Sequence, residues 1–65
     1  MTATVALSEQ QLDLLERMAK RELDASRSEL HHTDSPEYRE RVRREVALLE
    51  EIIALFERSR KGLAA

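Results

Sequence analysis

The stretch that decides the fold is residues 31–36, His-His-Thr-Asp-Ser-Pro, which lies near the middle of the 65-residue chain. Pro36 lacks a backbone N–H and disfavours helical geometry at Ser35, so a helix that reaches this stretch ends there. Pro36 also suits the first position of a new helix, with Ser35 as its N-cap and Glu37 placed favourably against the helix dipole. We therefore expect two helices joined by a turn at residues 33–35.

The residues before this turn have the pattern of a helix that begins at Ser8. Ser8 and Gln11 have the spacing of a capping box, in which each side chain bonds the backbone of the other residue. An apolar row then recurs with a period of 3.6 residues: Leu12, Leu15, Ala19, Leu23, Ser26 and Leu30. We expect a helix over residues 8–32, preceded by a flexible arm at residues 1–7, which show no helical period.

The second helix is expected over residues 36–61. Gly62 follows it in the position of a left-handed C-terminal cap, which leaves residues 63–65 as a tail. The short turn favours an antiparallel hairpin of residues 8–62. Its register pairs Leu30 with Tyr38, Ser26 with Val42, Leu23 with Val46, Ala19 with Leu49, Leu15 with Ile53 and Leu12 with Phe56.

Both helices have more apolar surface than one partner helix covers. On the second helix the apolar arc is about 180° wide, and on the first helix further apolar residues lie off the row used by the hairpin. A second copy of the chain would cover both surpluses, so the predicted fold is an all-α hairpin that dimerises into a four-helix bundle. The residues predicted at the interface are Leu14, Met18, Leu48, Ile52 and Leu55. Another protein docked on the same face would give the same pattern.

Composition excludes several classes of protein. The 11 Lys and Arg and the 13 Asp and Glu leave a net charge of −2, so no overall positive field attracts nucleic acid or an anionic membrane. No apolar run approaches the roughly 18 residues of a membrane span. With no cysteine, the chain has neither disulfides nor thiolate metal ligands. We expect a cytoplasmic protein whose partner is itself or another protein.

Residues that could carry chemistry gather near the turn. His31, His32 and Asp34 are candidate contacts for a partner at the hairpin tip. Adjacent helical histidines point about 100° apart and rarely bind one metal ion, whereas histidines near a helix C-terminus bond its last carbonyls. Glu22 and Glu45, with Glu29 before the histidines, interrupt otherwise apolar arcs, and we expect them to pair with arginine. We expect no catalytic, cofactor-binding or metal-binding residues.

Two resemblances bear on function. Residues 29–40, ELHHTDSPEYRE, followed by residues 48–53, LLEEII, resemble short, uncharacterised helical-hairpin proteins of bacteria, a resemblance that implies no activity. Asp34 at the tip resembles the acidic tips of the coiled-coil bacterial factors that enter the RNA polymerase secondary channel. We expect a non-enzymatic interaction or scaffold module that self-associates; the alternatives are a regulator that docks through its tip on a larger machine, such as the transcription machinery, and a metal-dependent enzyme.

Overall fold

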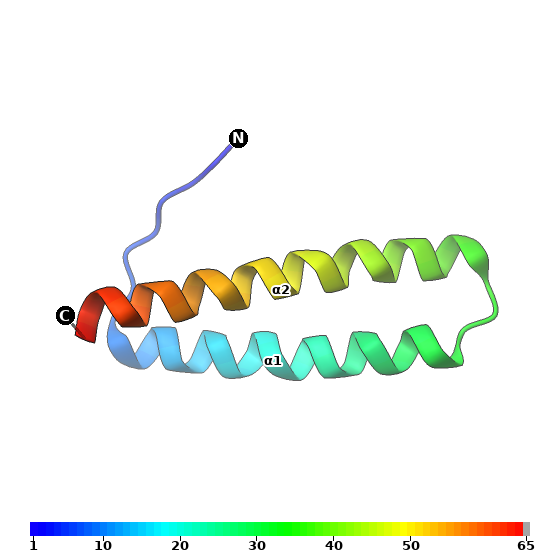
Figure 1. Cartoon of the computed structure of the whole chain (residues 1–65), viewed down its shortest axis with the longest axis horizontal. Coiled ribbons are helices and arrows are strands. Elements are labelled where there is room, and N and C mark those ends of the chain that lie inside the picture. The colour runs from blue at the N-terminus through cyan, green and yellow to red at the C-terminus, as the bar shows by residue number, and fades with distance from the viewer. Residues whose placement is uncertain (65) are drawn as a thin grey trace.

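The computed structural model is an antiparallel hairpin of two long helices, with both chain ends opposite the turn (Figure 1). Helix α1 spans Glu9–His32 and helix α2 spans Pro36–Ala64. The structure describes the backbone of residues 1–64 and the side chains of residues 1–60. Over the described residues there is no strand, which confirms the predicted all-α hairpin.

Both ends of α1 carry backbone bonds beyond the helix itself. The Ser8 hydroxyl accepts a hydrogen bond from the backbone N–H of Gln11 at 3.1 Å, and the Gln11 side chain accepts one from the Ser8 N–H at 2.9 Å. At the other end, the N–H of Thr33 donates to the carbonyl of Glu29 at 3.0 Å. The predicted capping box is confirmed, and it determines where the helix begins.

The turn between the helices is as short as the sequence predicts. Thr33 is extended, with φ −102° and ψ 138°, so the chain leaves the helical path directly after α1. Pro36 is the first residue of α2. The N–H of Tyr38 donates to the Ser35 hydroxyl at 3.4 Å, which makes Ser35 the cap of the second helix.

The core is the seam between the two helices. Ser26 of α1 and Val42 of α2 are its most deeply buried residues, in agreement with the register that pairs them. The buried residues among those described are Leu12, Glu16, Ala19, Leu23, Ser26 and Val42, with Leu30, Val46, Leu49, Ile53 and Phe56 half-buried. Only four of the buried side chains are apolar, so the hairpin has a small core.

One position of the predicted core row is wrong. Leu15, which was expected to pack against Ile53, is 37% exposed, whereas Glu16 is 8% exposed and takes its place in the buried row. The change affects this position alone: the neighbouring residue, about 100° around the helix, is buried instead, and the other members of the row keep their places. A buried carboxylate is acceptable here because Lys20 and Arg60 both lie within ion-pair distance of it.

The predicted end of the second helix is also wrong. Helix α2 continues through Gly62 to Ala64, and no described residue has a positive φ, so Gly62 does not form a left-handed cap. A glycine costs a helix about 1 kcal/mol relative to alanine, which does not by itself end a long helix that is followed by good helix formers. Residue 65 of the predicted tail lies outside the described residues.

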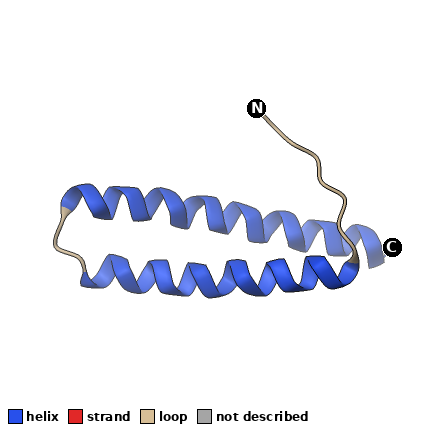
Figure 2. Ribbon diagram, turned by 180° about the vertical axis from the view of Figure 1, so that it is seen from behind, coloured by secondary structure: helices blue, strands red, loops and turns tan. Residues whose placement is uncertain are grey.

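Residues 1–7 form an arm without helix or strand. It leaves the start of α1 and crosses α2 near the C-terminal end of that helix, in front of it in Figure 2. Ala3, Thr4, Val5 and Leu7 of the arm line one wall of a groove whose other wall belongs to the two helices. The arm therefore lies beside one side of the hairpin without adding to the buried seam.

Candidate functional site

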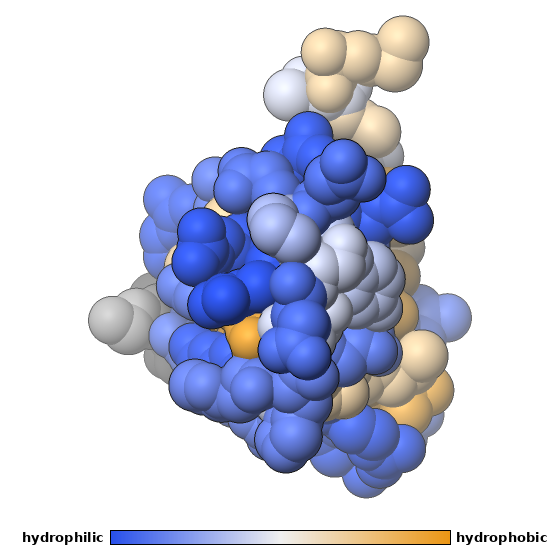
Figure 3. All heavy atoms as spheres, turned by 90° about the vertical axis from the view of Figure 1, so that its right-hand side faces the viewer, coloured by the Kyte–Doolittle hydropathy of each residue, from blue (hydrophilic) through white to orange (hydrophobic). Residues whose placement is uncertain are grey.

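Apolar side chains that the hairpin does not bury are the most prominent surface feature. The five residues predicted at the interface are all exposed, by 38% to 57%: Leu14, Met18, Leu48, Ile52 and Leu55. By contrast, the end of the molecule at the turn is mostly hydrophilic when it is viewed end-on (Figure 3). Exposed apolar surface is therefore concentrated away from the turn.

The two helices contribute to this surface on the same side of the hairpin. On α2, Leu48, Ile52 and Leu55 follow one another at helical spacing. Leu15 of α1 lines the groove together with Ile52 and Leu55, which places all three on one side. Met18 lies one turn after Leu15 on the same side of α1. We call these five residues the apolar face.

Leu14 does not belong to this face. With 3.6 residues per turn, Leu15 and Met18 lie about 60° and 120° from the centre of the buried row of α1, whereas Leu14 lies about 160° from it. Leu14 therefore points away from α2, along a row that continues with Arg21 and Ser28. Thus four of the five predicted interface residues lie on the apolar face, which Leu15 completes; the interface itself stays a prediction.

The groove beside the arm runs along the apolar face. Its volume is about 830 Å³, and it is lined by Ala3, Thr4, Val5, Leu7, Leu12, Leu15, Ile52, Leu55, Phe56 and Ser59. The side chain of Val5 is 72% exposed, so the arm covers the groove only partly. Among the residues with described side chains, no charged residue lines it, so burial of apolar area is the available driving force on this surface.

The apolar face ends before the turn. Toward the turn, the same side of the hairpin carries Glu22 and Glu29 on α1 and Arg41 and Glu45 on α2, all of them exposed. Glu29 accepts a hydrogen bond from the Tyr38 hydroxyl at 3.1 Å, and this bond raises the pKa of Tyr38 above its usual value. The partner of Glu29 is therefore Tyr38 and not the expected arginine.

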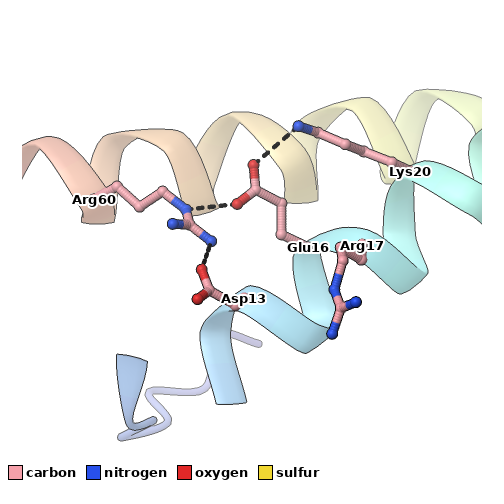
Figure 4. A pocket seen from close by; sticks show the side chains of 5 residues that line it. All are labelled: Asp13, Glu16, Arg17, Lys20 and Arg60. Atoms are coloured by element: carbon pink, nitrogen blue, oxygen red, sulfur yellow. Dashed lines mark hydrogen bonds and ion pairs between the residues drawn. The ribbon is translucent and has the colours of Figure 1, made fainter. Parts of the chain in front are cut away.

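The opposite side of the hairpin carries an ionic cluster near the open end. Arg60 of α2 makes ion pairs with Asp13 and Glu16 of α1, and Glu16 also pairs with Lys20 at 3.2 Å (Figure 4). Arg17, which the spacing would pair with Asp13, points away from the cluster. A hollow of about 470 Å³ lies among these five side chains.

The charges within the cluster compensate one another. The hydrogen bond from Lys20 lowers the pKa of Glu16, and Arg60 adds to this effect against the opposing effect of burial. The hydrogen bond to Asp13 raises the pKa of Arg60 in turn. The Nε atom of Arg60 is buried without a well-aligned hydrogen-bond acceptor, so the Glu16 charge compensates it. The cluster thus joins α1 and α2 by ion pairs near the open end of the hairpin.

The pair of Glu16 with Lys20 follows from local i,i+4 spacing, but the contribution of Arg60 is missing from the sequence analysis. A signal was available, because Glu16 lies one helical turn from both Leu12 and Ala19 in the apolar row. A carboxylate at such a position needs a cation from the facing helix. Arg60, near the end of the second helix, supplies this cation through its long side chain.

The predicted tip residues do not converge on a common point. His32 donates from Nδ1 to the carbonyl of Ser28 at 2.8 Å, the bond expected for a histidine at a helix C-terminus. His31 and Asp34 are exposed. Among the described residues, no group of three or more histidines or acids has the arrangement that would hold a metal ion. Within the same part of the chain, neither helix has the length and apolar character needed to cross a membrane.

No protein-family model matches this chain, no curated protein is significantly similar to it in sequence, and no solved structure matches its fold.

Proposed function

We propose that the protein is a non-enzymatic interaction module that self-associates through its apolar face, with two hairpins forming a four-helix bundle. The observation that carries this proposal is the exposure of the face itself. Large apolar side chains from both helices lie together on one side, while the seam of the hairpin buries only four apolar side chains among the described residues. Among the described residues the molecule thus leaves more large apolar residues exposed than it buries.

Size supports the same conclusion. A domain of about 60 residues buries only about 60% of the surface that its unfolded chain exposes, and such domains are only marginally stable alone. Burying one large aliphatic side chain contributes about 1.5 to 3 kcal/mol, and the apolar face offers five that are only partly covered. A second copy carries the same face and is always present at the same concentration, which makes it the simplest occupant.

Sedimentation equilibrium from low to high micromolar concentration tests this proposal. We expect a dimer for the natural sequence. Leu48→Glu places a charge in the middle of the face and is expected to abolish dimerisation, together with much of the helix content in circular dichroism. Ala47→Glu is the matched control, because it adds the same charge to an exposed neighbouring position outside the face.

Two outcomes would contradict the proposal. One is a folded monomer for the natural sequence throughout the concentration range. The other is equal loss of dimer in the Leu48→Glu and Ala47→Glu variants, because a charge outside the face has no reason to separate the copies.

A further inference from the structure

The apolar face occupies only part of the hairpin, and this restricts how two copies fit together. Leu15, Met18, Ile52 and Leu55 lie toward the chain ends and Leu48 lies near the middle of α2, whereas charged residues continue the same side toward the turn. Resting on the self-association proposed above, we propose that two copies pack antiparallel with their apolar faces opposite each other. The two turns then project from opposite ends of the dimer.

Two hairpins that stack face to face can be related by a twofold axis along their length or by one across it. An axis along the length brings both turns to the same end and sets α1 opposite the partner's α2. An axis across the length separates the turns and sets each helix antiparallel to its own copy. The two arrangements therefore bring different residues together.

The relative level of the two helices follows from contacts across the hairpin. Ser26 and Val42 are the most deeply buried residues of the seam, and both are eight positions from Asp34. The hydrogen bond from Tyr38 to Glu29 joins residues at nearly equal distances from the same position. Near the turn, residues equally far from Asp34 in the sequence thus lie roughly side by side. The ion pairs of Arg60 with Asp13 and Glu16, and of Arg27 with Glu50, join residues five to nine positions off this register through long side chains.

An axis across the hairpin matches the apolar residues with one another. The midpoint between Leu15 and Met18 and the midpoint between Leu48 and Leu55 are equally far from Asp34 in the sequence, so one axis serves both helices. It sets Leu15 against the partner's Met18. It also sets Leu48 against the partner's Leu55, with Ile52 close to the axis. All five members of the face then meet an apolar surface.

Charge favours the same arrangement. An axis across the hairpin sets Glu22 opposite the partner's Gln11 and Glu45 level with the partner's Arg58, and it places Arg41 near the edge of the overlap, level with the partner's Gly62. An axis along the hairpin would set Glu22 opposite the partner's Glu45, and symmetry would repeat this contact. Carboxylates brought together at an interface repel each other and lose hydration.

The N-terminal arm does not prevent this overlap. Its residues line the groove beside Leu55, where the partner's helix would lie. Met1 and Val5 remain largely exposed, so the arm gains little from its position. When a second copy binds, Leu55 packs against the partner's Leu48. This contact buries more apolar area than the contact of Leu55 with the arm, which it replaces.

The distance between the two turns distinguishes the arrangements. The chain has no cysteine, so Asp34→Cys creates a single exposed site for a spin label at the turn. At a rise of 1.5 Å per residue, the antiparallel overlap places the two labels roughly 50 Å apart. An axis along the hairpin would bring them to the spacing of packed helices, roughly 10 Å. Pulsed electron paramagnetic resonance measures the long distance, and line broadening of the continuous-wave spectrum reveals the short one.

A second measurement uses a cysteine near the proposed axis. In the antiparallel overlap, Ile52→Cys lies close to its own copy and is expected to form an intermolecular disulfide on mild oxidation. Glu57→Cys is the control, because it lies in the row of Glu50, whose ion pair with Arg27 at 3.5 Å is on the other side of the hairpin. We expect no disulfide-linked dimer from the control.

Each outcome has a definite meaning when sedimentation is measured on the same labelled sample. A dimer with the long distance and the Ile52→Cys disulfide supports the antiparallel overlap. A dimer with the short distance, or one in which Ile52→Cys does not cross-link, overturns the overlap but leaves self-association standing. A monomer overturns self-association and the overlap with it.

Discussion

At the scale of single residues, Glu16 has more influence on the contact between the two helices than its neighbours in α1 have. It occupies a buried position in an otherwise apolar row because Lys20 and Arg60 compensate its charge. The pair with Arg60 joins the two helices and compensates Glu16 on the side of α1 that faces α2. Leu15, next to it in the sequence, remains on the surface as one of the five members of the apolar face.

Glu16→Gln tests this role. Because the folded state lowers the pKa of Glu16, the ionised carboxylate stabilises the fold above its ordinary pKa of 4.5, and that contribution is lost as the pH falls through the folded value. We expect the variant to be less stable than the natural sequence at pH 7 in urea unfolding. The difference should shrink below pH 4.5 and vanish once Glu16 is protonated.

Glu50→Gln is the matched control for this substitution. Glu50 pairs with Arg27 in a salt bridge in which both side chains are about half exposed, so its loss is expected to change the free energy of unfolding by no more than about 0.5 kcal/mol. Equal effects of the two substitutions at pH 7 would show that Glu16 has no special role. So would a Glu16→Gln effect that is independent of pH.

At the scale of the helices, the capping box makes Ser8 the most sensitive position at the start of α1. Ser8→Ala removes the hydroxyl that accepts from the Gln11 N–H, so we expect a loss of about 1 kcal/mol in the free energy of unfolding. Ser28→Ala is the control, since Ser28 is exposed within the same helix and alanine has the higher helix propensity. A cap effect no larger than that of the control would contradict this prediction.

The end of α2 gives a prediction of opposite sign. Because Gly62 is helical, Gly62→Ala is expected to raise the free energy of unfolding by about 0.5 kcal/mol, less than the full propensity difference because it lies in the last turn. A left-handed cap at this position would make alanine destabilising instead. Denaturant unfolding of the variant and the natural sequence decides between these signs.

The sequence predicts those features that depend on neighbouring residues and misses those that depend on the facing helix. Ser8 with Gln11 and Ser35 with Pro36 are local signals, and they place the helix starts correctly. The exchange of Leu15 for Glu16 could not be read locally, since its cause is Arg60, 44 positions away. Leu14 and Leu15 are neighbours in the sequence but lie about 100° apart around the helix, so only one of them belongs to the apolar face. The predicted interface residues and the apolar face therefore share four residues and differ in the fifth.

At the scale of the whole molecule, size and surface pattern are connected. A single hairpin measures 45 × 25 × 16 Å and has one seam, so every apolar residue off the seam remains on the surface. In the proposed dimer the apolar face of each copy covers that of the other, and the two turns stay in water. Folding and association would then be one process.

Thermal unfolding at several concentrations tests this coupling. For a folded dimer that unfolds to separate chains, each tenfold dilution costs about 1.4 kcal/mol of apparent stability. With the average unfolding entropy per residue, a dimer of two 65-residue chains is expected to lose about 5 °C in Tm per tenfold dilution. Ala47→Glu should keep this dependence, and Leu48→Glu should lack it. A Tm that stays constant for the natural sequence would mean that the hairpin folds alone, with the apolar face exposed to water.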